Sequence, residues 1–199
     1  MFTIEKTFTG DLAHRIHTQR LDSDFTEGNS KVLKCRRLHG HTFGLKVKLG
    51  SNTLENNMVL DYNELGFVKD MINDILDHRT LIATSDPILL KVIMPVASNY
   101  ITRNEDEICS LTTETPWTNE KYMALKFNIE TVKDPDIKEF LDSFVIVPFT
   151  TSSENISKWI FGIVESRVNK FNQVHNTDVK VVSVSYKETP NSEAVYSEE

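Results

Sequence analysis

The sequence predicts an α+β domain built around an antiparallel sheet. Apolar and polar residues alternate near both ends of the chain, which is typical of strands that bury one face. In two longer segments the apolar residues recur every three or four positions, which is typical of helices that pack on such a sheet. The predicted order is strand, strand, helix, a long insertion, helix and strand.

The N-terminal part of the chain supplies the first strands and the first helix. Alternation predicts a strand over residues 2–9, a second over 42–49 and a short third in "MVLDY", residues 58–62, with a polar loop at 18–30. Asp61 can cap the helix that follows. The apolar positions of this helix are Leu65, Val68, Ile72, Ile75 and Leu76.

The C-terminal part supplies the second helix and the last strand. A broad apolar stripe from Ile156 to Phe171, preceded by Ser152 and Ser153, predicts a capped amphipathic helix. Residues 178–188, "DVKVVSVSYKE", predict a strand. The acidic tail should fray beyond Tyr196.

Between about residues 82 and 143 the periodicity is weaker, and we interpret this stretch as an insertion laid over the core. It should contain one short helix that ends at Pro95 and another with Pro135 in its first turn. The whole chain, 1–199, is then one domain with an insertion at 82–143.

Composition limits the function. The chain has 199 residues, 39% of them hydrophobic, no apolar run of membrane-spanning length and no secretory signal at its start, so we expect a cytoplasmic protein without membrane contact. A net charge of −7 argues against a general nucleic-acid binder. Two cysteines, Cys35 and Cys109, are too few for a disulfide framework, and Cys109 has no partner motif.

The segment "KCRRLHGHTF", residues 34–43, suggests a metal site. His39 and His41 lie two apart at the start of a strand, so both side chains point to one face and offer two zinc ligands. A third ligand is available from His14 or His17 in "LAHRIH", which point to opposite sides if that segment is extended. The fourth position either stays open, as in catalytic zinc sites, or is closed by Cys35.

Six segments occur in an order that resembles the 6-pyruvoyl-tetrahydropterin synthase family. They are "LAHRIH", "CRRLHGHTF", "MVLDY", "LDHRTL", "SSENISKWI" and "KETPNSEAVY", and they cover roughly residues 2–81 and 144–197. The Cys-x-x-x-His-Gly-His spacing and the Glu-Thr-Pro ending are most similar to the 6-carboxy-tetrahydropterin synthase branch, which serves queuosine biosynthesis. Two features depart from the family pattern: Ser152 and Ser153 replace its Pro-Thr, and the asparagine common after Asp-His is absent.

The resemblance implies the tunnelling fold, which is a four-stranded antiparallel sheet with two helices on one face. Its subunits join edge to edge, commonly into hexamers of two trimers with sites between subunits. It also implies that His14, and not His17, joins His39 and His41 as a zinc ligand, which leaves Cys35 unbound.

The resemblance further implies that Cys35 transfers protons together with Asp77 and His78, which end the first helix. Basic neighbours of Cys35 should favour its thiolate. An inert buried cysteine, and a histidine that only complements the helix dipole, are the structural alternatives.

By the same resemblance Glu188 anchors the pterin through its ring NH and exocyclic amine. Glu154 either contacts the pterin, in its own or a neighbouring subunit, or only favours the helix dipole. Candidates for the triphosphate are Lys34, Arg36, Arg37 and Lys187, each of which could equally be a solvated surface residue.

The expected activity is zinc-dependent conversion of 7,8-dihydroneopterin triphosphate to 6-carboxy-5,6,7,8-tetrahydropterin, with loss of acetaldehyde and triphosphate. The alternative enzyme is a 6-pyruvoyl-tetrahydropterin synthase acting on the same substrate, whose cysteine usually lies farther from the His-Gly-His motif. A non-catalytic module that binds zinc, a pterin or a partner protein is a third reading, against which the retained Cys35, Asp77, His78 and Glu188 argue.

Overall fold

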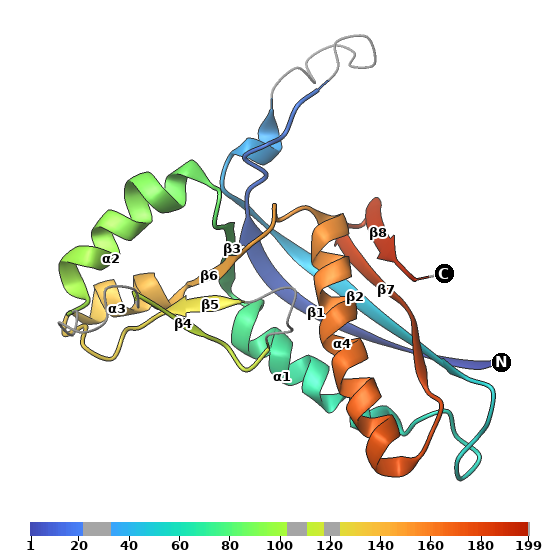
Figure 1. Cartoon of the computed structure of the whole chain (residues 1–199). Coiled ribbons are helices and arrows are strands. Elements are labelled where there is room, and N and C mark those ends of the chain that lie inside the picture. Colours follow the sequence, from blue (N-terminus) through green and yellow to red (C-terminus); the bar gives the residue numbers. More distant parts are fainter. Residues whose placement is uncertain (22–32, 103–110, 118–123, 199) are drawn as a thin grey trace.

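The computed structural model describes residues 1–21, 33–102, 111–117 and 124–198, and Figure 1 shows their arrangement. The strands are β1 (Phe2–His14), β2 (His39–Ser51), β3 (Arg79–Ala83), β4 (Thr112–Glu114), β5 (Leu125–Phe127), β6 (Phe144–Val147), β7 (Lys180–Thr189) and β8 (Ser192–Tyr196). The helices are α1 (Gly66–Ile75), α2 (Met94–Tyr100), α3 (Pro135–Asp142) and α4 (Ser153–His175), with short helical turns at Lys34–Arg36, Tyr62–Leu65 and Leu89–Ile93. In these parts of the chain the strands form one mixed sheet in the order β4-β5-β6-β3-β1-β2-β7-β8.

The predicted α+β class is confirmed, but the predicted four-stranded sheet is only one section of a larger one. Strands β1 and β2 pair antiparallel along their full length, from Phe2 opposite Ser51 to His14 opposite His39. Strand β7 pairs antiparallel with β2, and β8 with β7. Strands β3 and β6 extend this section by parallel pairing, β3 with β1 and β6 with β3. The sheet is therefore eight-stranded and mixed in the described residues.

One predicted strand is wrong, and among the described strands β3, β4, β5, β6 and β8 were not predicted. Residues 58–62 contribute only an isolated bridge between Glu55 and Met58, and Val59 and Leu60 are buried by packing in the core instead of by strand pairing. Strand β8 lies in the polar tail, where exposed residues outnumber buried ones. Its pairing with β7 holds this segment in an extended conformation despite its polar composition.

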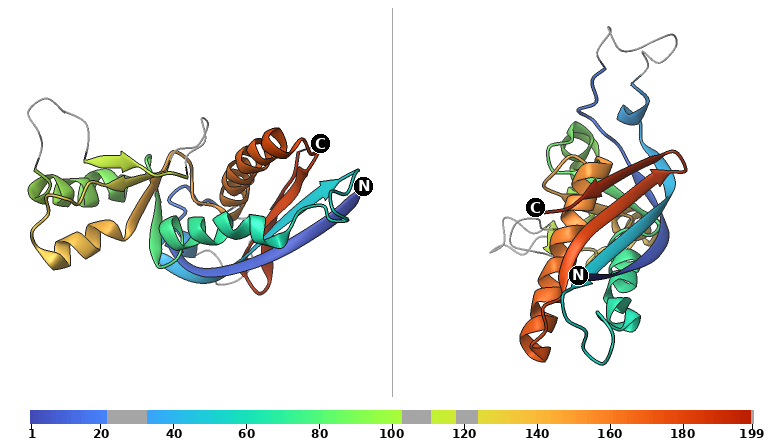
Figure 2. Two further views of the ribbon diagram at one scale, coloured as in Figure 1. Left: turned by 90° about the horizontal axis from the view of Figure 1, so that it is seen from below. Right: turned by 90° about the vertical axis from the view of Figure 1, so that its right-hand side faces the viewer.

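Helices α1 and α4 lie against the same face of the sheet formed by β1, β2, β7 and β8, and the main hydrophobic core fills the space between them (Figure 2). Both predicted caps are confirmed. The Asp61 carboxylate accepts a hydrogen bond from Asn63 N and begins the helical turn that leads into α1. Ser152 accepts from Asn155 N and begins α4.

Strands β3 and β6 and the residues between them form a second hydrophobic cluster. Its buried members include Ile82, Ala97, Phe127, Leu141 and Ile146. Pro135 begins α3 as predicted. Pro95, however, does not end a helix, because the helical turn Leu89–Ile93 continues without a break into α2, which contains Pro95.

Two expectations, Cys109 and most of the polar loop at 18–30, lie outside the described residues. Within the described chain every helix is too short or too polar to span a lipid bilayer.

Candidate metal centre

The pleat of β1 and β2 brings three histidines to one end of the buried face. Phe43 and Leu45 of β2 point into the core, and His39 and His41 occupy the preceding positions of the same face. His14 lies directly opposite His39 in the β1–β2 register, so its side chain points to the same side. The ring centroids of the three histidines lie 4.7 to 5.5 Å apart.

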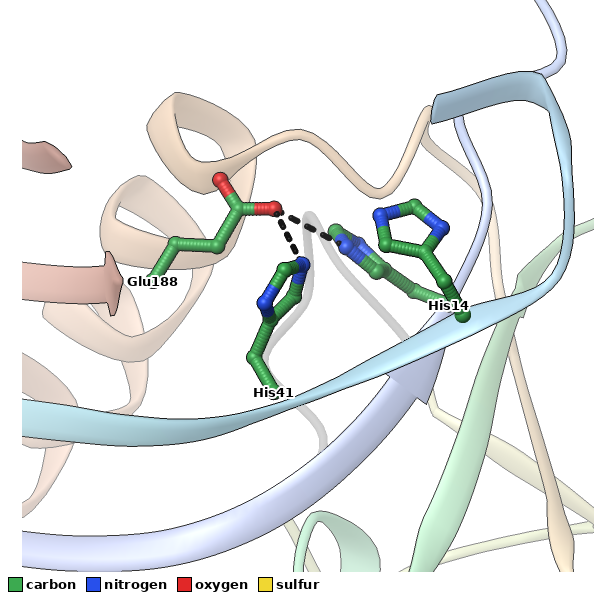
Figure 3. Close-up of side chains that lie close together, drawn as sticks. His14, His41 and Glu188 are labelled. Carbon is green, nitrogen blue, oxygen red and sulfur yellow. Dashed lines mark ion pairs between the residues drawn. The ribbon is translucent and has the colours of Figure 1, made fainter. Parts of the chain in front are cut away.

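Glu188 of β7 completes this group. Tyr186 pairs with Leu45 and is buried, and Glu188 follows two positions later on the same face. Its Oε1 atom lies 3.0 Å from His14 Nε2 and 3.2 Å from His41 Nε2, as Figure 3 shows. Potential ligand atoms of His14, His39, His41 and Glu188 all lie within 4.8 Å of one another. These four side chains are the histidine–glutamate cluster.

Backbone carbonyls orient two of the rings. His14 Nδ1–H donates to Thr151 O at 2.7 Å, and His39 Nδ1–H donates to Arg37 O at 2.7 Å. Because a carbonyl oxygen only accepts, each ring carries its proton on Nδ1, and each neutral ring then has a lone pair on Nε2. This arrangement is typical of histidines that ligate metals.

The cluster fits a metal ion. His14 Nε2 is buried, and the Glu188 carboxylate lies 3.0 Å from it. Because His14 Nδ1 already donates to Thr151 O, this contact is attractive only when Nε2 also carries a proton or when a cation lies between the two groups. Imidazole nitrogens and a carboxylate oxygen are suitable donors for a divalent transition metal.

The electrostatics of the cluster also suit a cation. The hydrogen bond from His14 and, after it, that from Ser153 lower the pKa of Glu188 to about 2, against the opposing effect of burial. Burial lowers the pKa of His41 from its ordinary value, although the Glu188 charge opposes this. Glu188 is thus ionised and His41 neutral at physiological pH, which are the forms that bind metals.

The other candidate ligands, His17 and Cys35, lie outside the cluster. His17 lies beyond the end of β1, in a turn instead of an extended segment, and its ring nitrogens lie 3.5 Å from Ser85 Oγ and 3.7 Å from an Asp86 carboxylate oxygen. Cys35 lies half-buried in the turn Lys34–Arg36, and its carbonyl accepts a hydrogen bond from Ile16 N at 2.6 Å. The fourth potential ligand is Glu188 and not the thiol.

Asp77 and His78 form a second group with Asp11. His78 Nδ1 lies 3.1 Å from Asp77 Oδ2, and Asp11 N–H donates to Asp77 Oδ1 at 2.8 Å. That backbone hydrogen bond is the main reason why the pKa of Asp77 is lowered. His78 has a left-handed backbone, with φ of 57°, and its side chain is 79% exposed. The group is separate from the histidine–glutamate cluster within one chain.

Gly10 makes room for this second group. A Cβ atom at position 10 would lie 2.9 Å from Phe43 Cζ, closer than real contacts occur, and 3.1 Å from Asp77 Oδ1, closer than most real contacts. The absence of a side chain at Gly10 therefore lets Asp77 approach β1 and accept from Asp11 N.

The remaining predicted residues do not join either group. Glu154 is exposed in the first turn of α4, and the basic side chains of Lys34, Arg36, Arg37 and Lys187 are exposed.

The sequence reasoning missed two contributors, one at the first residue of α4 and one just before it. Ser153 Oγ donates to Glu188 Oε2 at 2.6 Å, and the Thr151 carbonyl accepts from His14. Ser153 was visible only as part of a helix cap, and Thr151 acts through its backbone, which leaves no sequence signal.

Comparisons with known proteins give matches over nearly the whole chain. The chain matches the family model described as 6-pyruvoyl tetrahydropterin synthase over residues 3–199. It is 30% identical to the 6-carboxy-5,6,7,8-tetrahydropterin synthase of Aquifex aeolicus, over 98% of each chain. The crystal structure of an uncharacterized protein from Wolinella succinogenes is 32% identical and superposes with a TM-score of 0.81, covering 100% of this chain and 98% of that one. The Plasmodium vivax 6-pyruvoyltetrahydropterin synthase, at 14% identity, 98% coverage of each chain and a TM-score of 0.51, shares the fold.

Proposed function

Because the chain belongs to the 6-pyruvoyl tetrahydropterin synthase family, we propose that it is a 6-carboxy-5,6,7,8-tetrahydropterin synthase that acts on 7,8-dihydroneopterin triphosphate and releases acetaldehyde and triphosphate. The family resemblance predicted from the sequence is confirmed. The observation that carries the proposal is the convergence of His14, His39, His41 and Glu188 at the end of one sheet face, in a chain similar over its full length to a synthase of this name.

The metal in this proposal is zinc, held by His14, His39 and His41. Three imidazoles with an exchangeable fourth position form a typical catalytic zinc site, and the Nδ1 hydrogen bonds to Thr151 O and Arg37 O already set the ring orientation. When bound, zinc supplies a Lewis acid for an oxygen of the substrate side chain.

Glu188 holds the pterin ring. Its carboxylate is ionised, and Ser153 fixes one oxygen by donating to it at 2.6 Å. Two carboxylate oxygens match the paired N–H donors of the pterin ring and its exocyclic amine. Since the same carboxylate lies within 3.2 Å of His14 and His41, it places the ring directly beside the histidines.

Proton transfer falls to Cys35 and to His78, which Asp77 orients through the 3.1 Å contact with Nδ1. Asp77 and His78 are separate from the histidine–glutamate cluster in one chain, so in this proposal neighbouring subunits complete each site. The proposed assembly is a homo-oligomer, a hexamer of two trimers. Its support is that no described strand pairs with the outer edges of β8 and β4, and subunit contacts would cover such edges.

The outer part of the site is assigned to exposed residues. Glu154 would contact the pterin from its own or a neighbouring subunit, and Lys34, Arg36, Arg37 and Lys187 would contact the triphosphate as charged donors. We place the enzyme in the cytoplasm, where a reducing environment keeps Cys35 as a thiol.

Incubation of the zinc-loaded protein with 7,8-dihydroneopterin triphosphate, followed by mass analysis of the products, tests the activity. The expected products are 6-carboxy-5,6,7,8-tetrahydropterin, acetaldehyde and triphosphate. Accumulation of 6-pyruvoyl-tetrahydropterin alone would instead identify the alternative synthase, and binding without turnover would identify a non-catalytic module.

A further inference from the structure

One fully buried carboxylate has no place in the proposed reaction. Asp86 lies at the start of the inserted stretch, directly after β3, and is 0% exposed. Its Oδ2 atom lies 3.0 Å from Arg15 Nε, and its Oδ1 atom accepts a hydrogen bond from Ile88 N at 2.9 Å. A buried carboxylate is costly unless it is paired, so this ion pair fixes the insertion to the chain that leaves β1.

Arg15 leads from this ion pair to the histidine–glutamate cluster. It follows His14 directly, and its carbonyl accepts a hydrogen bond from Thr151 Oγ1 at 2.9 Å. The Thr151 carbonyl in turn accepts from His14 Nδ1 at 2.7 Å. Thr151 is 0% exposed, so water does not compete for these hydrogen bonds.

The contacts therefore run without a gap from Asp86 through Arg15 and Thr151 to His14. The segment that carries Thr151 is held on its other side as well, because Asn155 Nδ2 donates to Thr150 O at 2.9 Å. A shift of the Arg15 carbonyl would consequently move the Thr151 carbonyl and with it the His14 ring.

We propose that Asp86 is a positioning residue for the metal centre, which acts through Arg15 and Thr151 to hold His14 with Nε2 directed into the histidine–glutamate cluster. This role rests on the proposed metal site, and it gives the insertion a function in that site. Residues that do not touch the metal but orient its histidine ligands typically raise metal affinity about 10- to 100-fold. We expect Asp86 to raise the metal affinity within this range.

The test compares Asp86→Asn with Asp74→Asn in the full chain. Asp74 is a suitable control because it also ties the insertion to the core, through Lys126 at 2.7 Å and Trp117 at 2.8 Å, without contact to the cluster. Zinc affinity is measured by chelator competition, cobalt substitution by the visible absorption spectrum, and folding by thermal unfolding.

Asp86→Asn should weaken zinc binding about 10- to 100-fold and alter the cobalt spectrum, whereas Asp74→Asn should change neither. Thr151→Val removes the donor to Arg15 O but keeps the carbonyl. It should reproduce part of the effect, and the two changes combined should be less than additive because they interrupt one series of contacts. If Asp86→Asn does not fold, Thr151→Val decides the matter by the same readouts.

Two outcomes would overturn the role. In the first, Asp86→Asn binds zinc as tightly as the wild type and gives the same cobalt spectrum; Asp86 is then structural only and the proposed function stands. If Asp86→Asn does not fold, the same result for Thr151→Val has the same meaning. If the wild-type chain binds neither zinc nor cobalt, the proposed metal site fails together with the role of Asp86.

Discussion

Replacing Glu188 by glutamine separates its two chemically plausible roles, pterin anchor and fourth metal ligand. The proposed function assigns the ring to Glu188 and the metal to the three histidines alone. Glu188→Gln keeps the size of the side chain and one acceptor oxygen, but it replaces the other oxygen by an NH₂ group. That group meets a pterin N–H donor, so one hydrogen bond is lost.

The structure sets the size of the effect. The Glu188 side chain is only 17% exposed, so its hydrogen bonds are largely shielded from water. A hydrogen bond to a charged group contributes about 1.5–3 kcal/mol, so kcat/KM should fall roughly 10- to 150-fold, mainly through KM. The zinc content should stay at the wild-type level, because His14, His39 and His41 are intact.

Steady-state kinetics and metal analysis of the same preparation measure both quantities. Glu193→Gln is the matched control, since Glu193 is an exposed carboxylate on β8 that pairs with Lys46 at 3.2 Å, and such surface pairs contribute little. Loss of zinc from Glu188→Gln, with an unchanged KM once zinc is restored, would refute the anchor role and make Glu188 a metal ligand.

Three further predictions concern the groups around the cluster. Cys35→Ala should keep its zinc and lose about 10²- to 10⁴-fold in kcat, as measured by single-turnover kinetics; loss of zinc would mean that the thiol is a ligand. Gly10→Ala should displace Asp77, costing about 1–3 kcal/mol of stability by overpacking and lowering kcat at unchanged zinc content; full activity would show that the 3.1 Å approach to Oδ1 does not matter. Because the Asp11 N–H lowers the pKa of Asp77, its ionised form stabilises the fold above the unfolded pKa of about 3.9, and this contribution disappears as the pH falls through the lower folded value. The stability difference between wild type and Asp77→Asn, followed by denaturant unfolding, should therefore shrink in acid, and a difference that grows in acid would contradict the assigned cause.

The histidine positions could be predicted because they depend on the strand pleat. His39 and His41 continue the face of Phe43 and Leu45, which alternation shows directly. The contribution of Glu188 to the cluster was not predictable in the same way. It depends on the register between β2 and β7, which shifts between Lys48 and Leu49, and a single sequence does not encode register visibly.

The inserted stretch escaped prediction for a different reason. Strands β3 and β6, which border residues 82–143, are short and largely buried, so they show no alternation, and their parallel partners are distant in the sequence. In "MVLDY" a strand was predicted where none forms, because the apolar residues that pack in the core there have the spacing of a strand. Asp86 looked like an ordinary residue before Pro87, and only the folded chain brings it to Arg15.

Diffraction data from a crystal of the purified protein, collected above and below the zinc absorption edge, would show whether the three histidines hold zinc. We expect one anomalous peak per chain, at about 2.0–2.1 Å from nitrogens of His14, His39 and His41, with the Cys35 sulfur unbound. A peak bonded to the Cys35 sulfur, or one remote from His14, would contradict this expectation.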